Sequence, residues 1–170
     1  GDSLAVQPKN SDKLVSTLLE TTHFDPNIIV SIKDVKYSFK EAIKSVLDIT
    51  TLSVPFLTRY NSISNNLALT TLLDDEDKSN IQNYINGRDL IDVLIDYPAK
   101  ELTAQSLVDL LRKLPPRLYS IASSQKANPN SVHLTVAVVR YETHGRKREG
   151  VCSTFLANRL DLDATADVFV

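Results

Sequence analysis

The sequence predicts an α+β fold with strands at both ends of the chain and helices between them. Apolar residues recur at helical spacing through residues 11–114, and Pro115-Pro116 must end that pattern. Apolar and polar residues then alternate as they do in strands. We therefore expect three segments: a strand within residues 1–10, helices within 11–114, and mainly strands within 115–170.

Helix-start and helix-stop signals follow one another through the middle segment. Ser38 and Glu41 form a capping box, Pro55 stands in the first turn of a helix, and Gly87 follows the end of another. Thr103 is placed to open the last helix before the two prolines. These signals predict helices over residues 11–22, 38–49, 55–62, 75–86, 88–96 and 103–114, and a brief strand over 28–32.

The final segment reads mainly as strands, over residues 118–123 and 132–141. In the second stretch the even-numbered residues from Val132 to Val138 form a purely aliphatic face, which we expect in the core. The opposite face carries small or polar groups and ends on Tyr141, as suits a ligand-binding surface. Residues 150–160 are expected to form a helix and residues 167–170 a strand.

Composition limits the class of protein. No apolar run approaches the roughly 20 residues that span a bilayer, and no signal segment opens the chain, so we expect a cytoplasmic protein without a membrane part. The single cysteine excludes an internal disulfide, and three histidines with Cys152 do not make a zinc site, so no metal is expected. The sequence contains no methionine, and we therefore expect a piece of a longer protein.

Charge is distributed unevenly along the chain, whose formal net charge is -2. Residues 112–159 contain nine basic and two acidic residues, whereas the acidic residues lie mainly in the helical segment. This local excess favours an anionic small ligand or an acidic partner protein, with solvated loops as the alternative. Nucleic acid is not expected as a partner.

The first four residues, Gly1-Asp2-Ser3-Leu4, spell the nucleophile block of a class of serine esterases. A serine hydroxyl attacks only when a histidine held by a carboxylate takes its proton. That class supplies the pair as Asp-x-x-His, which does not occur at His23, His133 or His144. The esterase is an alternative that the sequence disfavours.

The stretch from Arg117 to Ser120 carries groups suited to a phosphorylated flat ring. The arginine fork matches a phosphate, the face of Tyr119 matches a ring, and the Ser120 hydroxyl can donate to a ring nitrogen. Downstream, Gly150–Ser153 stands at an expected helix start, where free amides suit a pyrophosphate and the glycine allows close approach. Cys152 is interpreted there as a small packing residue rather than a redox thiol.

Arg117-x-Tyr119-Ser120, the 132–141 stretch and Gly150-x-Cys152-Ser153 together resemble the FAD-binding module of ferredoxin-NADP reductase type found in the diflavin reductases. The resemblance covers essentially the whole chain and is greatest to the bacterial sulfite reductase flavoproteins, with cytochrome P450 reductases as the alternative. It implies a partial Greek-key FAD-binding β-barrel, formed by residues 1–10 and 115–170, with a large all-helical connecting insertion over residues 11–114. Gly1-Asp2-x-Leu4 is then a barrel strand.

The resemblance also implies roles for individual residues. Arg117 would pair with the FAD pyrophosphate, Tyr119 would stack on the isoalloxazine ring, and Ser120 would be the catalytic group near the flavin N5. Because strict alternation puts Ser120 on the Leu118 side of the strand, a bend or bulge after Tyr119 is expected. The full implied cofactor-binding set is Arg117, Leu118, Tyr119, Ser120, Thr135, Val136, Ala137, Tyr141, Gly150, Val151, Cys152 and Ser153, with Thr50 and Asn86 of the insertion.

Diflavin reductases pass electrons from NADPH through FAD to FMN, and the resemblance implies this activity for the parent protein. The FMN and NADPH domains are not recognisable in this sequence, so we expect the chain alone to bind FAD without turning over NADPH. The implied partners are those two domains and a sulfite reductase hemoprotein that makes sulfide, in an oligomeric parent. A flavin-free docking module is a further alternative, which the intact Arg117, Tyr119 and Ser120 set disfavours.

Overall fold

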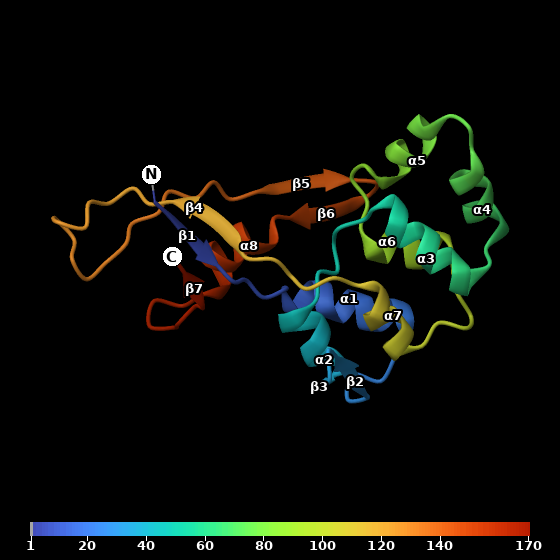
Figure 1. Cartoon of the computed structure of the whole chain (residues 1–170), viewed down its shortest axis with the longest axis horizontal. Coiled ribbons are helices and arrows are strands. Elements are labelled where there is room, and N and C mark those ends of the chain that lie inside the picture. The colour runs from blue at the N-terminus through green and yellow to red at the C-terminus, as the bar shows by residue number, and fades with distance from the viewer. Residues whose placement is uncertain (1) are drawn as a thin grey trace. The chain divides into compact units, whose positions relative to one another are not determined.

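The computed structural model describes residues 2–170 and divides the chain into two compact units (Figure 1). One, here called the β unit, joins the residues up to Ser11 with Leu114–Val170. The other, the helical unit, is Asp12–Lys113. The chain combines helices with small sheets, so the predicted α+β class is confirmed.

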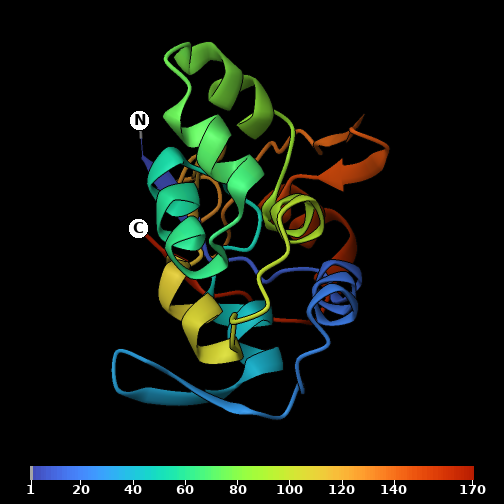
Figure 2. The same cartoon turned by 90° about the vertical axis from the view of Figure 1, so that its right-hand side faces the viewer.

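The helical unit is built from short helices and one hairpin (Figure 2). Its longest helices have 11 residues each, and no helix within residues 2–170 is long and apolar enough to cross a membrane. The elements in chain order are α1 (Asp12–Thr22), β2 (Ile29–Ile32), β3 (Val35–Ser38), α2 (Phe39–Glu41), the π-helical turn η1 (Ala42–Val46), α3 (Val54–Ser64), α4 (Leu67–Asp74), α5 (Lys78–Ile85), α6 (Leu90–Asp96) and α7 (Ala104–Leu110).

The core of the helical unit gathers the apolar stripes of its helices. Val15 and Leu18 of α1, for example, lie three residues apart on one face and are both buried. Tyr60 is the largest fully buried side chain, and its hydroxyl donates to the Tyr97 carbonyl oxygen, so its polar end is satisfied. Other fully buried members of this core are Phe39, Ile43, Leu57, Leu69, Leu90 and Leu107.

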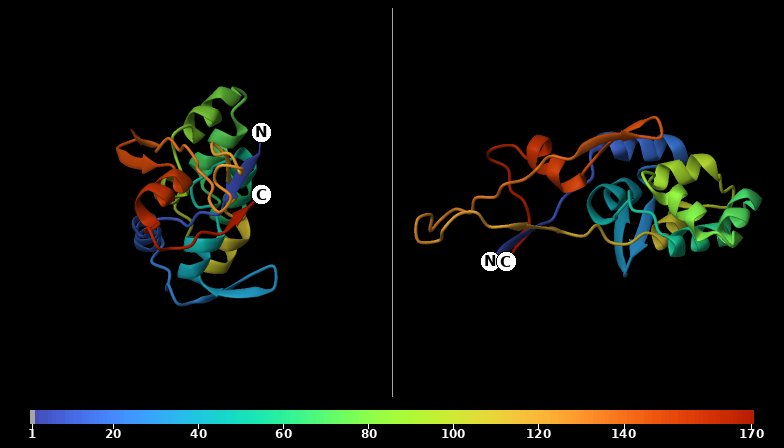
Figure 3. Two further views of the ribbon diagram at one scale, coloured as in Figure 1. Left: turned by 90° about the vertical axis from the view of Figure 1, so that its left-hand side faces the viewer. Right: turned by 90° about the horizontal axis from the view of Figure 1, so that it is seen from above.

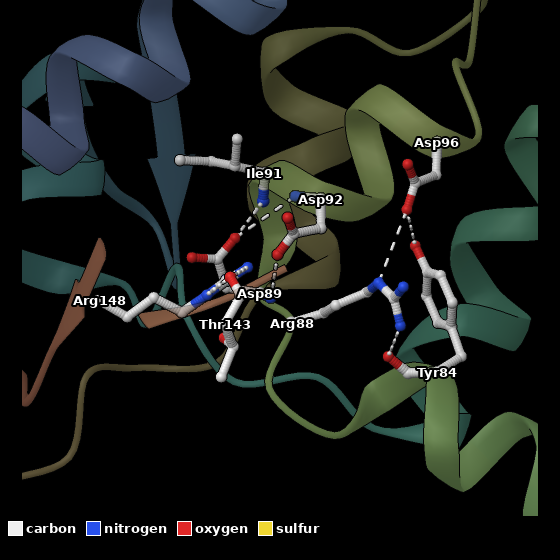
Figure 4. A network of polar contacts seen from close by, with 8 residues as sticks. All are labelled: Tyr84, Arg88, Asp89, Ile91, Asp92, Asp96, Thr143 and Arg148. Atoms are coloured by element: carbon white, nitrogen blue, oxygen red, sulfur yellow. Dashed lines mark hydrogen bonds and ion pairs between the residues drawn. The ribbon is translucent and has the colours of Figure 1, made fainter. Parts of the chain in front are cut away.

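Side-chain caps set helix starts close to the predicted positions. The Ser38 hydroxyl accepts a hydrogen bond from the Glu41 amide, and Thr103 caps α7. Asp89 caps α6 through a reciprocal box with Asp92 (Figure 4). A polar side chain just ahead of an apolar stripe thus provides an acceptor for otherwise unpaired amides.

Helix ends differ more from the expectations than helix starts do. The helix expected over residues 38–49 ends at Val46 after the π-helical turn, and the helix expected to reach residue 114 ends at Leu110. Within the helical unit, β3 and α4 lie in stretches for which nothing was predicted. α4 forms because Asn65 adopts the left-handed conformation that ends α3, after which Asn66 caps the new helix.

The β unit contains a three-stranded antiparallel sheet in the order β4-β1-β7 (Figure 1). Its first and last strands in the chain lie side by side (Figure 3). β1 (Ser3–Val6) is the central strand, between β4 (Arg117–Ser120) and β7 (Val168–Phe169). A separate hairpin, β5 (Arg140–Thr143) and β6 (Arg146–Glu149), turns at His144-Gly145, where both residues have positive φ. Helix α8 (Val151–Thr154) continues into a second π-helical turn, η2 (Phe155–Arg159).

A small apolar cluster holds the sheet of the β unit to α8. Val6, Cys152 and Phe155 are its buried members, and Leu4, Tyr119 and Leu134 are among the half-buried side chains packed on it. In the hairpin, the Arg148 guanidinium donates to the Thr143 carbonyl oxygen at 3.3 Å (Figure 4). Polar contacts of this kind supplement the small core.

The predicted strand over residues 132–141 is wrong for most of its length. Leu134 forms an isolated bridge with Ile121, and only the last two residues of the stretch belong to β5. Of the expected core face, Val132 and Val138 are 47% and 41% exposed. Alternation fixes which side a residue faces, but a ladder also needs a neighbouring strand, and within residues 2–170 none lies beside residues 135–139.

The predicted Greek-key β-barrel is not confirmed by the observed sheets. Strands within residues 2–170 form sheets of three, two and two strands, and none of them closes on itself.

A buried carboxylate ties the middle of the helical unit to its C-terminal end. The Asp48 side chain is 4% exposed, and its Oδ1 accepts from the amides of Thr50 at 2.9 Å and Thr51 at 3.1 Å. Its Oδ2 accepts from both Nε and Nη2 of Arg112, at 3.1 and 3.0 Å. Burial, the largest influence, raises the pKa of Asp48, but these hydrogen bonds together outweigh it and hold the pKa below its ordinary value.

We expect Asp48→Ala to lower the free energy of unfolding by about 2–3 kcal/mol, because it removes a charged acceptor from several donors at once. Arg112→Ala should cost about 1 kcal/mol or less, since the Arg112 side chain is 64% exposed and its charge is screened by solvent. Urea unfolding of both variants measures the difference. Equal losses in the two variants would contradict this assignment.

The lowered pKa of Asp48 also predicts a pH dependence. A depressed folded-state pKa contributes stability that is fully present above the unfolded pKa, near 3.8, and is lost as the pH falls through the folded pKa. The stability deficit of Asp48→Asn relative to the wild type should therefore be constant near neutral pH and shrink below about pH 4. A deficit that stays the same from pH 7 to pH 3 would show that the carboxylate charge is not responsible.

Candidate functional site

The candidate site starts from the register of β1 with β4. Val6 lies opposite Arg117 and Leu4 lies opposite Tyr119, and directly opposed residues share a face of an antiparallel sheet. Arg117 and Tyr119 are therefore on the same face, and Tyr119 packs on the Val6, Cys152 and Phe155 cluster. The structure thus brings a guanidinium and an aromatic ring to one side of β4, next to α8.

Ser120 and Leu118 lie on the opposite face of β4. The four residues from Arg117 to Ser120 pair one to one with Val6 back to Ser3, and the Ile121 amide donates to the Asp2 carbonyl oxygen at 3.0 Å. The expected bulge after Tyr119 is absent because the ladder continues without an extra residue. Ser120 is exposed, and Leu118 is 67% exposed.

The Tyr119 hydroxyl is engaged with Cys152. The two groups influence the pKa of each other, and the Cys152 thiol donates to the Val6 carbonyl oxygen at 3.9 Å. Burial raises the pKa of Tyr119 to about 12, with a further rise from Cys152 and an opposing effect from the nearby Arg117 charge. Burial also raises the pKa of the Cys152 thiol, so this cysteine is a protonated, close-packed group rather than a reactive thiolate.

A tight turn at Gly150 leads into α8. The Gly150 amide donates to the Val139 carbonyl oxygen at 3.0 Å, and the Val139 amide donates to Ser153 Oγ at 3.1 Å. The backbone of Gly150 is extended, so conformation alone does not require glycine. Space does, because a Cβ at this position would lie 2.7 Å from Ser153 Oγ and 3.1 Å from the Val139 Cβ.

Residues Thr135–Ala137 run between the two halves of the site. On one side the Leu134 bridge places them beside the end of β4, and on the other side Val139 ties them to the start of α8. Thr135 and Ala137 are exposed and Val136 is half-buried. Tyr141, in β5, is 49% exposed.

The donor set of the β unit fits a flavin nucleotide. A guanidinium and the first amides of α8, which have no carbonyl one turn before them, suit a pyrophosphate. Tyr119 offers an aromatic ring, and Gly150 keeps the backbone of the turn accessible. Within residues 2–170 no group of three His, Cys, Asp or Glu side chains could hold a metal ion.

Arg159 supports this region and was not singled out from the sequence. Its Nη2 donates to the carbonyl oxygens of Val151 at 2.8 Å and Lys9 at 3.0 Å, and its Nη1 donates to Thr154 Oγ1 at 2.8 Å. The side chain thereby braces α8 against the chain that leaves β1. Its position in the last turn of a helical stretch was the one signal available, and that signal does not identify its acceptors.

Thr50 and Asn86 belong to the helical unit. The amide and hydroxyl of Thr50 both donate to Asp48 Oδ1, at 2.9 and 3.1 Å. The Asn86 amide donates to the Gln82 carbonyl oxygen at 3.0 Å, at the end of α5. These hydrogen bonds of both residues are local ones within the helical unit.

A hollow of about 550 Å³ lies among α4, α5 and α6 of the helical unit. Its polar groups satisfy one another: the Tyr84 hydroxyl donates to Asp96 Oδ2 at 2.8 Å, and Arg88 Nη1 donates to the Tyr84 carbonyl oxygen at 2.9 Å (Figure 4). The Arg88 guanidinium also lies 4.5 Å from the centre of the Tyr84 ring. We interpret this group as structural.

The sequence comparisons agree with the donor set of the β unit. Residues 1–155 match the family model described as FAD binding domain. The whole chain is 46% identical to the sulfite reductase [NADPH] flavoprotein alpha-component of Bacillus subtilis, 39% identical to that of Mannheimia succiniciproducens and 38% identical to that of Serratia proteamaculans. It spans 28% of the length of each of these relatives. The chain belongs to the FAD binding domain family.

Proposed function

We propose that the β unit binds FAD between β4 and α8. The observation that supports this most directly is the placement of Arg117 and Tyr119 on one face of β4, beside the turn at Gly150. Arg117 and the amides of residues 151–153 would hold the pyrophosphate, and Tyr119 would lie against the isoalloxazine ring. Thr135–Ala137 and Tyr141 would line the remaining surface of the cofactor.

Ser120 is proposed as the group nearest the flavin N5. Ser120 is the last residue of β4 and is exposed. A flavin ring that extends past the end of the strand could therefore contact the Ser120 hydroxyl with its edge. The Leu118 side chain lies on the face of β4 opposite Arg117 and Tyr119, so Leu118 would contact the cofactor through its backbone. Thr50 and Asn86 are the contacts that we propose from the helical unit.

For the parent protein we propose the activity of a diflavin reductase that supplies a sulfite reductase hemoprotein. The support is the family and the names of the relatives. Arg117, Tyr119 and the amides of residues 151–153 would hold and orient FAD, which would supply the acceptance of a hydride from NADPH and the release of single electrons toward FMN. In this proposal the β unit is the FAD-binding barrel portion, the helical unit is the connecting insertion, and the parent is oligomeric and cytoplasmic.

The first test is retention of FAD by the chain. Wild type should retain flavin after removal of excess FAD, with quenched fluorescence from the ring against Tyr119. Tyr119→Ala should bind about tenfold or more weakly and fluoresce more brightly, because a stacked aromatic contributes roughly 1–3 kcal/mol. Visible absorbance and flavin fluorescence after gel filtration measure both effects.

Tyr119→Phe is the matched control, because it keeps the ring and loses the hydroxyl. It should quench flavin like the wild type. Brightening in Tyr119→Phe as large as in Tyr119→Ala would assign the effect to the hydroxyl and contradict stacking.

A second test addresses the charge of Arg117. Arg117→Ala should weaken FAD binding by about 10- to 100-fold and reduce its dependence on ionic strength, because charge-assisted hydrogen bonds to a phosphate are worth about 1.5–3 kcal/mol. Lys147→Ala, on the exposed strand β6, removes one positive charge as well and should leave the affinity nearly unchanged. Equal losses in the two variants would indicate a general effect of net charge.

A further inference from the structure

The guanidinium of Arg159 is engaged at both of its terminal nitrogens. Nη1 donates to Thr154 Oγ1 at 2.8 Å and to Glu149 Oε1 at 3.3 Å. Nη2 donates to the carbonyl oxygens of Val151 at 2.8 Å and Lys9 at 3.0 Å. These two nitrogens carry four N–H groups, and the four acceptors match them. Arg159 therefore offers no terminal N–H to a phosphate, and it would act on a ligand through the groups that it holds.

Two of these contacts reach the carbonyl oxygens at the start of α8. Arg159 holds the Val151 carbonyl directly. It holds the Gly150 carbonyl through Thr154, whose buried hydroxyl accepts from Arg159 and donates to the Gly150 oxygen at 2.7 Å. Hydrogen bonds linked in this way strengthen one another. The guanidinium thus restrains the first two peptide units of α8.

Restrained carbonyls also fix the directions of amides. A peptide unit is planar, and in the trans form its carbonyl and its amide point in opposite directions. The Gly150 carbonyl therefore sets the direction of the Val151 amide, and the Val151 carbonyl sets that of the Cys152 amide. These amides open the helix and have no carbonyl one turn before them, so they are free to face an anion.

The remaining backbone contact ties α8 to the sheet of the β unit. The Nη2 atom that holds Val151 also holds the carbonyl oxygen of Lys9, in the segment that follows β1. β1 pairs with β4, which carries Arg117 and Tyr119. One nitrogen atom thus joins the two halves of the proposed site.

We propose that Arg159 is a positioning residue, which aims the amides of Val151 and Cys152 at the FAD pyrophosphate and fixes their spacing from β4. This inference rests on the proposed FAD function. It adds to the site a residue that the family resemblance does not assign, and it leaves the groups that contact the phosphates unchanged.

The first test is Arg159→Lys in the full chain. Lysine keeps the positive charge but has one nitrogen and lacks the planar fork that bridges separate acceptors. FAD and ADP should both bind about tenfold more weakly, because both carry a pyrophosphate and the effect is that of a misplaced charge-assisted hydrogen bond. Tyr119→Ala, in contrast, should weaken FAD and spare ADP, which has no flavin ring. Calorimetric titration measures all four affinities, and wild-type affinities in Arg159→Lys would overturn the proposal.

Glu149→Gln is the matched control. It removes the carboxylate that pairs with Arg159 and leaves the acceptors in α8 in place. The Glu149 side chain is 40% exposed, so the ion pair contributes little, and the FAD affinity should stay within about twofold of the wild type. A loss as large as that of Arg159→Lys would assign the effect to the ion pair and would contradict the positioning role.

Hydrogen exchange without ligand tests the brace itself. The amides of Thr154 and Phe155 donate to the Gly150 and Val151 carbonyls, so they report on the restrained peptide units. In Arg159→Lys we expect selectively faster exchange at these two amides, with the amides of the β1–β4 ladder unchanged. Unchanged exchange at both amides, or equal acceleration throughout the β unit, would overturn the proposal.

Phosphorus NMR of bound FAD separates positioning from stability. Misdirected amides in Arg159→Lys should shift the two pyrophosphate resonances, whereas a smaller folded fraction would only reduce their intensity. Unshifted resonances would therefore contradict the positioning role. If the wild type binds neither FAD nor ADP, the proposed function fails and the role of Arg159 toward a ligand fails with it, while the exchange comparison still shows whether Arg159 restrains α8.

Discussion

The pairing of β1 with β4 is the constraint on which the candidate site depends. The whole helical unit separates these strands in sequence, yet their register fixes the side on which Arg117 and Tyr119 lie. A slip of one residue would move both side chains to the opposite face, away from α8. The entropic cost of closing the loop between β1 and β4 grows only slowly with the length of that loop. The helical unit also has a core of its own. An insertion of this size is therefore compatible with the strand pairing.

Local chemistry made much of the fold predictable. Ser38 and Thr103 act at helix starts because their side-chain oxygens accept hydrogen bonds from backbone amides. Pro55 fits the first turn of a helix because it has no amide that needs a partner. Both properties are visible in the sequence. Helix ends and the strand over residues 132–141 were less predictable because they depend on partners distant in the chain. Alternation at Val132–Val138 describes an extended backbone, and the fold supplies that backbone with one bridge instead of a ladder.

In the candidate site, too, the predictable features are those that depend on residue type, and the unpredictable ones depend on partners distant in the chain. Arg117, Tyr119 and the Gly150 turn were identifiable because their residue types state their chemistry, and the structure places them together in one unit. The Tyr119–Cys152 contact, the Arg159 brace and the use of Ser153 by Val139 were not identifiable, because each depends on which acceptor lies nearby in space. The sequence thus specifies donors and rings, whereas the fold decides which of them are left for a ligand.

The two units are stabilised in different ways, and this bears on how a cofactor would act on them. The helical unit has an extensive buried core, whereas the buried members of the β unit's cluster are Val6, Cys152 and Phe155. A ligand that binds only the folded protein stabilises it in proportion to the logarithm of its concentration over its dissociation constant. A cofactor touching β4, Thr135–Ala137 and α8 would add contacts where the β unit has few. Order in this unit and occupancy of the site would then be coupled.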